Sequence, residues 1–421
     1  MKEKLKSLTA IFYTPILIYF VFYVAISLVA IASATPVARV QYPLGNFVMR
    51  QMIFFAIGIV AVLVVLFFEL KRLRFIRWGL YFICLILLAL VYFVGERYPC
   101  IGTQDMLVPC LNGATRWINI PIPGLQFQLQ PSEFMRIALI LVLADIMQVH
   151  NEKFGLDTRT FKSDFWLITK SILVLIVPIY LIYDQPDTGI TILILVTTAF
   201  MLITAGIKWT YILAAGGIAA AVTVTFLNLV INNPHFLLDN GIIVDHQYVR
   251  FVGWFDPFSR ISHEGRHLAL GLIAMASGGL FGNGFASGAH FFPEAHTDYI
   301  FAVIGMDFGM IGSSIVILLN LLFSFTILKT AVLNREHYNN HVCVGIFASL
   351  MAQQFWNIGM IVGLLPISGV TLPFISHGGS SVLASMIMLG IILTSHVEGL
   401  TIKRSNTVFR EDILYLNEKL L

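Results

Sequence analysis

The residues IFYTPILIYFVFYVAISLVAIASA, Ile11–Ala34, decide the fold because they carry no charged side chain over the full length of a membrane span. A hydrocarbon core about 30 Å thick needs about 20 apolar residues in helical form, since unpaired backbone groups are too costly in lipid. Lys2, Lys4 and Lys6 precede this run, but it is too long for the apolar part of a removed signal peptide. We therefore expect a first transmembrane helix here.

Similar runs continue along the chain, which is 58% hydrophobic and 12% charged; soluble domains carry about 25% charged residues. The clear spans are Ile11–Ala34, Met49–Leu70, Trp78–Gly95, Trp166–Tyr183, Thr188–Gly206, Trp209–Ile231, Tyr299–Leu328, Val342–Leu365 and Phe374–His396. A tenth, Glu133–Gln148, is shorter and contains Arg136 and Asp145, but the topology requires it. The sequence thus predicts an all-α membrane protein of about ten transmembrane helices in one polytopic domain, residues 1–421.

Lysine and arginine residues set the orientation of these spans. With the N-terminus inside, 18 of the 26 basic residues fall on the cytoplasmic side, including Lys71, Arg72 and Arg74. The seven on the outward side are Arg39, Arg50, Arg97, Arg116, Arg250, Arg260 and Arg266. Because cytoplasmic loops of membrane proteins carry the excess of basic residues, we expect both termini in the cytoplasm, with residues 400–421 as a short tail.

Two outward segments, 96–132 and 232–298, are much longer than the other connections. Long loops in compact proteins are usually functional or disordered, and the Trp, Phe, Pro and Gly residues in these two favour order. Within the second, His267–Phe281 is apolar but too short to span, so a helix at the outer surface is expected. Cys100 and Cys110 share the first segment, where a disulfide is plausible, whereas Cys84 and Cys343 fall in spans as apolar fillers.

Acidic residues near a bilayer are costly, so each raises a functional question. Asp187, Asp256, Glu294 and Asp298 lie on the predicted outward face. Asp298 could cap the long helix that follows it, since Asp is a favoured N-cap, or it could serve catalysis, and the two roles do not exclude each other. Prolines flank Asp187 and Asp256, so turn capping explains these two nearly as well as ligand binding does.

Glycine and arginine mark the same face. Glycines at 278, 279, 282 and 284, and again at 378 and 379, would let the backbone approach a ligand or cradle an anion, although glycine also serves helix packing. Outward arginines could bind phosphates or pair with nearby acids. The G-x-x-x-x-G-K-[ST] nucleotide loop is absent, and a net charge of +3 is too small to indicate nucleic acid.

Six ordered segments carry a resemblance to a known family. They are Gly113–Ile118 (GATRWI), Gln130–Phe134 (QPSEF), Gln185–Asp187 (QPD), Pro293–Phe301 (PEAHTDYIF), Asn357–Pro366 (NIGMIVGLLP) and Leu372–Ser381 (LPFISHGGSS). The chain resembles the SEDS family (shape, elongation, division and sporulation), whose members include RodA, FtsW and SpoVE. Asn357–Met360 slightly favours the RodA branch, whereas Thr371–Pro373 favours the other two. The chain has His377 where the family often has Tyr, and Arg136 where Lys is common.

The resemblance implies a peptidoglycan glycosyltransferase that polymerises lipid II at the outer face of the bacterial cytoplasmic membrane. Asp298 matches the family's essential acid, with a proposed role as general base on the acceptor 4-hydroxyl. The residues expected to bind substrate are Arg116, Asp187, Arg250, Glu294, His296, Thr297, Ser376, His377, Gly378, Gly379, Ser380 and Ser381. The resemblance also implies a class B penicillin-binding protein as partner, and a divalent cation, Mg²⁺ or Mn²⁺, could assist at the pyrophosphate.

Two other functions fit a polytopic protein of this kind. A lipid II flippase would depend on charged residues at mid-depth, such as Asp145 and Arg136, and would move label across a vesicle bilayer. A scaffold for division or elongation proteins would tolerate changes at Asp298. The gathering of candidate residues on one outward face favours the enzyme.

Overall fold

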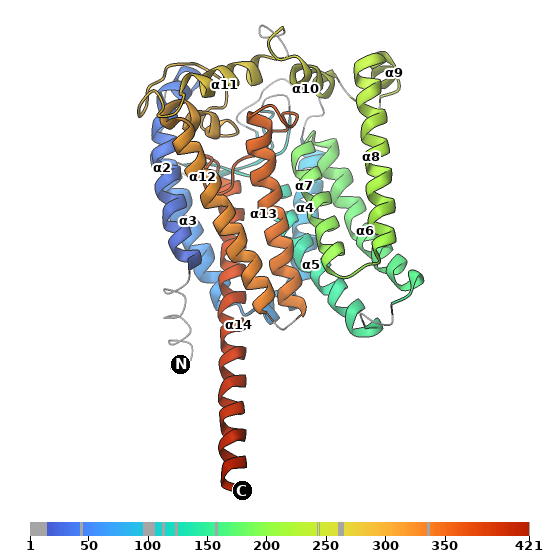
Figure 1. Cartoon of the computed structure of the whole chain (residues 1–421). Coiled ribbons are helices and arrows are strands. Elements are labelled where there is room, and N and C mark those ends of the chain that lie inside the picture. Colours follow the sequence, from blue (N-terminus) through green and yellow to red (C-terminus); the bar gives the residue numbers. More distant parts are fainter. Residues whose placement is uncertain are drawn as a thin grey trace.

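The computed structural model describes residues 15–42, 45–95, 106–111, 114–122, 125–155, 159–241, 243, 245–259, 265–334 and 337–420. Its long helices are α2 (Pro15–Gln41), α3 (Phe47–Phe67), α4 (Leu70–Val94), α5 (Pro131–Phe154), α6 (Phe161–Asp184), α7 (Thr188–Thr204), α8 (Trp209–Asn232), α12 (Ile300–Leu333), α13 (His337–Ile361) and α14 (Gly379–Leu420). They run roughly parallel to one another as a bundle, and α14 extends beyond it at one end (Figure 1).

Each predicted span corresponds to one of these helices. Among the described residues, eight helices are long and apolar enough to cross a membrane: α2, α3, α4, α6, α8, α12, α13 and α14. The other two are α7, which has 17 residues, and α5, which is long but carries Glu133, Arg136 and Asp145. The nearly all-helical membrane fold is thus confirmed, and the count of ten crossings stays a prediction.

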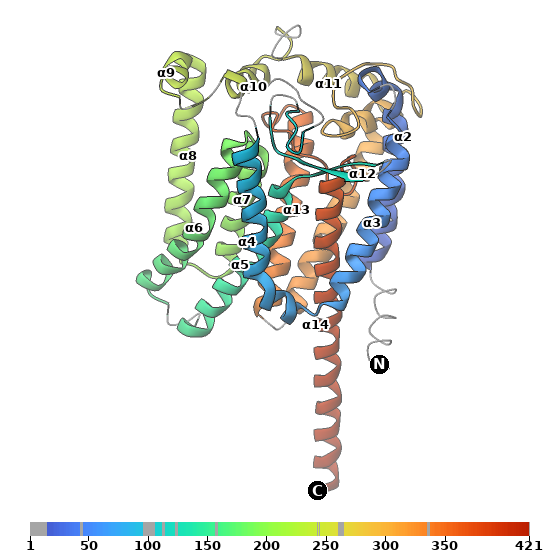
Figure 2. The ribbon, with the colours of Figure 1, turned by 180° about the vertical axis from the view of Figure 1, so that it is seen from behind.

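Burial divides the helices into a centre and a periphery. Most residues of α5 and α13 are buried by their neighbours, whereas Val230 is the only buried residue that the structure records in α8. Both views show α8 at the edge of the bundle (Figures 1 and 2). Its exposed apolar side chains, such as Leu213, Val222 and Val224, are suited to lipid rather than to water.

The end of the bundle opposite the α14 extension carries α9 (Pro234–Asp239), α10 (Asp245–Phe255) and α11 (Arg266–Ser277) (Figure 1). The helix predicted at His267–Phe281 is therefore confirmed as α11, which ends at Ser277, and its place at the outer membrane surface stays a prediction. The first long segment holds a β-hairpin, β1 (Ile118–Ile122) with β2 (Leu125–Leu129), paired antiparallel with Ile118 opposite Leu129. This hairpin was not predicted, so the all-α description is incomplete there.

The four cysteines behave largely as expected. Cys110 is disulfide-bonded, and Cys84 and Cys343 are buried free thiols. Cys100, the predicted partner of Cys110, lies outside the described residues.

Helix α12 is broken at Gly309, whose φ of 66° and ψ of −161° are not helical. The segment after α11 fills the break: Asn283 donates its backbone N–H to Met306 O (2.9 Å), and Gly279 O accepts from Met310 N (2.9 Å). A Cβ on Gly282 would lie 2.2 Å from Asp307 O. Gly282 therefore serves close packing, one of the two uses predicted for this glycine-rich segment.

Candidate active site

Asp298 stands at the end of a tight turn that leads into α12. Glu294 starts this turn with a positive φ of 53°, which is unusual for a residue with a side chain. Its carbonyl accepts the backbone N–H groups of Thr297 (3.2 Å) and Tyr299 (3.1 Å), and its carboxylate accepts from Thr297 Oγ1 (2.7 Å) and Tyr42 OH (3.4 Å). Glu294 thus organises the turn from within.

Three successive carbonyl groups of the turn are held from outside it. His296 O accepts the backbone N–H of His377 (2.9 Å), and Thr297 O accepts Ser376 Oγ (2.8 Å). Asp298 O accepts Asn357 Nδ2 (2.8 Å) from α13. Because these contacts fix the backbone on both sides of Cα, they fix where the Asp298 side chain begins without engaging its carboxylate.

The carboxylate of Asp298 lies beside the connection between α13 and α14. The side chain is half-buried, and a Cβ built on Gly369 would sit 3.5 Å from its Oδ2. Helix α12 begins at Ile300, and its N-cap is Tyr299, which makes no side-chain cap bond. The capping interpretation of Asp298 is therefore wrong, because the turn places Tyr299 rather than Asp298 at the cap position.

The residues between Ser376 and Ser381 connect this turn to other parts of the bundle. His377 Nδ1 lies 3.2 Å from Gln51 Oε1 in α3. Ser380 Oγ donates to Gln128 O (2.5 Å) and accepts from Gln130 N (2.9 Å), which fixes the hairpin; β2 lies beside α14 in Figure 2. Ser381 Oγ is 2.7 Å from Thr371 Oγ1 and half-buried.

The two glycines of this segment differ. A Cβ on Gly379 would meet the Phe127 ring at 2.9 Å, so Gly379 is needed for packing, whereas one on Gly378 would approach nothing closer than Ser381 Cβ at 3.9 Å. Gly378 is therefore the glycine of the pair with room for another group beside it.

A second polar cluster lies at the start of α7. Asp187 is buried and accepts from Gln130 Nε2 (2.8 Å) and Ser132 Oγ (2.9 Å), with Arg116 Nη1 at 3.7 Å. Asp187 occupies the N-cap position of α7 but makes no side-chain cap bond. Pairing with an acid, one of the two roles predicted for outward arginines, is thus confirmed for Arg116.

The cluster around Asp187 and the turn that carries Asp298 both pack against residues 368–370. A Cβ on Gly189, just after Asp187, would meet Val370 Cγ2 at 2.5 Å and Ser368 O at 2.9 Å, and Gly369 between them adjoins Asp298. Six predicted site residues are thus in contact with one another or adjacent in sequence: Glu294, His296, Thr297, Asp298, Ser376 and His377. Arg116 and Asp187 belong to the second cluster, which residues 368–370 separate from Asp298.

Other predicted residues lie on α10 and α11, at the same end of the bundle (Figure 1). Arg250 is part of α10, and its side chain lies outside the described residues, as does Arg260. Arg266 is exposed at the start of α11. Asp256 is exposed and accepts from Ser259 N (3.3 Å) and Ser259 Oγ (2.8 Å), which confirms the turn-capping interpretation.

Sequence reasoning missed several buried amides around Asp298. Gln51, Gln353 and Asn357 are each wholly shielded from solvent, and Gln353 Nε2 donates to Thr371 O (3.1 Å). Within the described residues, Asn357 Oδ1, Gln353 Oε1 and Ser368 Oγ have no hydrogen-bond partner. Buried polar atoms of this kind call for water or ligand. A lone amide in an apolar run is the only sequence signal that could have found them.

Two histidines of the site are held neutral. Burial lowers the pKa of His296 to about 4, with Glu294 opposing the shift. Burial, then His296 and Arg50, lower the pKa of His377 to about 3. The two rings are neighbours at 5.6 Å between centroids. Burial and then Glu294 raise the pKa of Tyr42 to about 12, so its hydroxyl stays a donor.

These histidines predict loss of stability in acid. A histidine whose pKa is lowered by folding destabilises the native state as the pH falls from its unfolded value near 6.5, by roughly 1.4 kcal/mol per pH unit, until the folded pKa is reached. The melting temperature in detergent should therefore fall between about pH 6.5 and about pH 4. The His377→Asn variant cannot take up this proton, so its melting temperature should fall less. Each protein is compared with its own melting temperature at pH 8. An equal fall would show that other groups cause it.

The described residues contain no group of three or more His, Cys, Asp or Glu side chains that could hold a metal ion. The donor set near Asp298 thus does not make a protein-only site for Mg²⁺ or Mn²⁺, and the cation stays a prediction.

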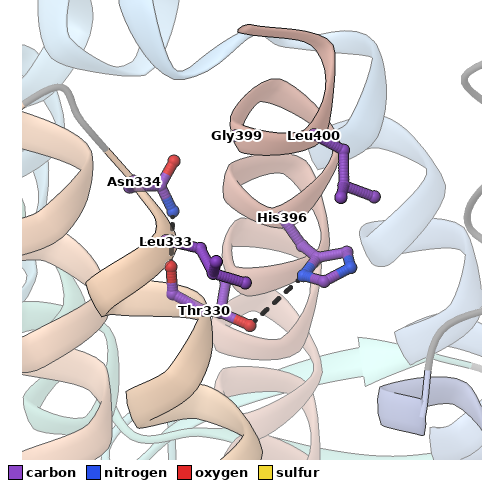
Figure 3. A pocket seen from close by; sticks show the side chains of 6 residues that line it. All are labelled: Thr330, Leu333, Asn334, His396, Gly399 and Leu400. Atoms are coloured by element: carbon purple, nitrogen blue, oxygen red, sulfur yellow. Dashed lines mark hydrogen bonds between the residues drawn. The ribbon is translucent and has the colours of Figure 1, made fainter. Parts of the chain in front are cut away.

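A pocket in the described part of the chain lies elsewhere, between α12 and α14 (Figure 3). Thr330, Asn334 and His396 contribute polar atoms to its wall, with His396 Nδ1 3.3 Å from Thr330 Oγ1. Thr330 lies in the last turn of α12, whereas Asp298 precedes the first residue of this helix, Ile300. This pocket does not belong to the candidate site.

Comparison with known proteins is consistent with the fold and the motifs. Residues 13–399 match the model of a family described as cell cycle protein, FtsW, RodA and SpoVE. A probable peptidoglycan glycosyltransferase FtsW of Geobacter metallireducens is 30% identical over 352 residues, 82% of this chain and 84% of that protein. Stage V sporulation protein E of Bacillus subtilis is 28% identical, over 82% of this chain and 86% of its own length.

Two solved structures share the fold. A chain from a peptidoglycan synthase complex, solved to show the structural coordination of polymerization and crosslinking, has a TM-score of 0.70 at 24% identity, covering 91% of this chain and 97% of its own. RodA of Thermus thermophilus has a TM-score of 0.61 at 22% identity, covering 90% and 95%. The slight preference for the RodA branch is not supported, since these sequence relatives are FtsW and SpoVE proteins. The chain is a multi-pass membrane protein and belongs to the FtsW, RodA and SpoVE family.

Proposed function

We propose that the protein polymerises the disaccharide units of lipid II into glycan strands at the outer face of the bacterial cytoplasmic membrane. The observation that carries this function is the turn at 294–298, which presents a half-buried carboxylate at the end of the bundle opposite the α14 extension. The name of the FtsW relative supports the same chemistry.

In the proposed reaction, the Asp298 carboxylate takes the proton of the acceptor sugar's 4-hydroxyl. The oxygen forms a bond to the anomeric carbon of the donor as the bond to undecaprenyl pyrophosphate breaks, and the electron pair leaves with the pyrophosphate. A hydroxyl is a poor nucleophile at neutral pH, so a positioned base helps by roughly 10²–10⁴. Displacement of an α-linked leaving group gives a β-linkage without an enzyme-bound sugar.

The geometry suits Asp298 to this role. The bonds that hold its turn end on carbonyl oxygens, at His296, Thr297 and Asp298 itself. A base must keep its geometry while its charge changes, and a turn fixed through backbone groups does so. The neighbouring Gly369 places no side chain against the carboxylate.

Some of the remaining predicted substrate-binding residues already bond to other protein groups, and others have open space beside them. Ser376, Ser380, Arg116 and Asp187 are engaged with protein groups, and we assign them to the support of the site. Gly378 and Ser381 are half-buried with room beside Gly378, and we propose them as substrate neighbours. Arg250 stays a proposed contact for the pyrophosphate.

We also infer a partner that crosslinks the new strands, a class B penicillin-binding protein. The peptidoglycan synthase complex that contains the similar chain coordinates polymerization and crosslinking, and our chain covers 97% of that similar chain. In this proposal the partner supplies the transpeptidase.

The test is polymerisation of lipid II by the purified protein in detergent, with and without its penicillin-binding partner, read as glycan strands on a gel. Strand formation is expected, and it needs no membrane sidedness. A flippase would instead move labelled lipid II across vesicles and make no strands. Folded protein that forms no strands with any partner would remove the polymerase assignment.

A further inference from the structure

We infer that Gln51, in α3, is a positioning residue for Asp298, acting through Ser376 and His377. The inference rests on the proposed function of Asp298 as the base. Gln51 is far from Asp298 in sequence and is not among the residues expected to bind substrate. Its amide nevertheless connects α2, α3 and the segment before α14 to the catalytic turn.

The Gln51 amide is completely shielded from solvent and fully used. Its Nε2 donates to Ser27 Oγ (3.1 Å) in α2 and to Ser376 O (3.2 Å). Its Oε1 faces His377 Nδ1 at 3.2 Å. A buried amide with all its bonds made is costly to disturb, because its partners lose their bonds where water cannot replace them.

These bonds also fix the state of the histidine ring. Ser376 O can only accept, so the NH₂ of Gln51 must point to it and the carbonyl oxygen of Gln51 must point to His377. His377 Nδ1 is therefore the protonated nitrogen of a neutral ring, and Nε2 carries the lone pair. Gln51 selects this tautomer as well as the ring position.

The same two residues hold the turn that carries Asp298. Ser376 Oγ donates to Thr297 O (2.8 Å) and accepts Leu372 N (2.8 Å), and the His377 backbone N–H donates to His296 O (2.9 Å). Loss of the Gln51 amide would release residues 376 and 377 and, with them, two of the three outer bonds of the turn. A shift of about 1 Å in a catalytic group can cost about 10²-fold in rate.

The surroundings of His377 make the pH dependence a specific readout. The charged or titratable groups that face it are His296 from the turn and Arg50 from α3; the other ring neighbours, Phe47 and Phe54, are apolar. Gln51→Glu would place a carboxylate against Nδ1. That carboxylate favours the imidazolium, so His377 should begin to titrate at near-neutral pH.

The experiment measures lipid II polymerisation by Gln51→Glu against pH, with the penicillin-binding partner where the wild type needs it. We expect kcat to fall about 10- to 100-fold with KM nearly unchanged, and a new ionisation between about pH 5 and pH 8. His377→Asn, whose Nδ2 can replace Nδ1 as donor to Gln51, should show no ionisation of its own in this pH range. Gln51→Glu combined with His377→Asn should lose the new ionisation.

The matched control is Gln354→Glu. Gln354, in α13, is also buried, with 4% of its surface exposed against 0% for Gln51. Its Oε1 accepts Ser324 Oγ (3.2 Å) from α12, away from the turn. The Gln354→Glu substitution should lower the melting temperature to a similar extent as Gln51→Glu but leave the kcat of the folded protein unchanged. Wild-type kcat and pH profile in Gln51→Glu, or an equal loss of kcat in Gln354→Glu, would overturn the inference. Absence of strands from the wild type would instead count against the proposed function.

Discussion

Asp298→Asn protein is expected to insert and fold normally and to lose lipid II polymerisation by roughly 10²–10⁴-fold. The amide keeps the size of the side chain but accepts a proton far less readily than the carboxylate does. The bonds that hold the turn end on backbone oxygens, so these bonds do not depend on the charge of the side chain. The measurement is the rate of strand formation per folded molecule, normalised by size-exclusion chromatography and by the melting temperature.

Asp256→Asn is the matched control for this variant. Asp256 is also a predicted outward acid next to a proline, but it is exposed, and among the described residues its carboxylate bonds to Ser259. It should polymerise at the wild-type rate within about twofold, as most exposed substitutions do. If Asp298→Asn also kept that rate, Asp298 would not be the base, and a scaffold or a different acid would have to be considered.

The parts of this fold that sequence predicted are those with a local cause. Apolar runs of spanning length determine helices by themselves, because lipid leaves backbone groups no other partners. The turn at Pro293–Asp298 is also local, since Glu294 bonds to Thr297 and Tyr299. The cluster was therefore identifiable from a short motif, although the cap position was misplaced by one residue.

The parts that sequence did not predict depend on distant contacts. Gln51 lies in an apolar run that looks like any start of a helix, and its role comes from residues 376 and 377, which follow more than 300 positions later. The hairpin at 118–129 has its Pro-Gly turn signal in the sequence, but its strands are short and depend on Ser380 for anchoring.

Helix boundaries shifted for similar reasons. Helix α4 begins at Leu70, eight residues before the predicted start at Trp78. Its first turns carry basic residues, which an apolar run leaves out, and Leu70 N donates to Glu398 Oε1 (2.9 Å) in α14. At the break in α12, hydropathy alone shows an unbroken span, whereas the backbone of 279–284 supplies the missing hydrogen bonds. Hydropathy reports lipid preference and says little about which helices are neighbours.

The ion pair of Glu133 with Arg136 leads to the largest expected change in stability. Arg136 Nη2 is 2.7 Å from Glu133 Oε2, and both side chains are at most 4% exposed. The two residues form an i,i+3 pair on α5, buried among the central helices. Arg136→Met leaves the carboxylate without this partner in a medium that cannot solvate it. We expect a loss of about 3–5 kcal/mol, seen as a fall in melting temperature or in the yield of folded protein.

The reverse single change, Glu133→Gln, should cost a similar amount, because it leaves the guanidinium unpaired, and two of its nitrogens, Nε and Nη1, already lack partners among the described residues. The double variant, Glu133→Gln with Arg136→Met, removes both charges and should recover most of the lost stability, since a buried pair contributes little beyond neutralising itself. If the stability lost by the double variant instead equalled the sum of the two single losses, the two residues would act independently, and the ion pair would not explain their effect on stability. Polymerisation measured on the recovered double variant then separates a structural pair from a functional one: wild-type strands would assign both charges to the fold alone.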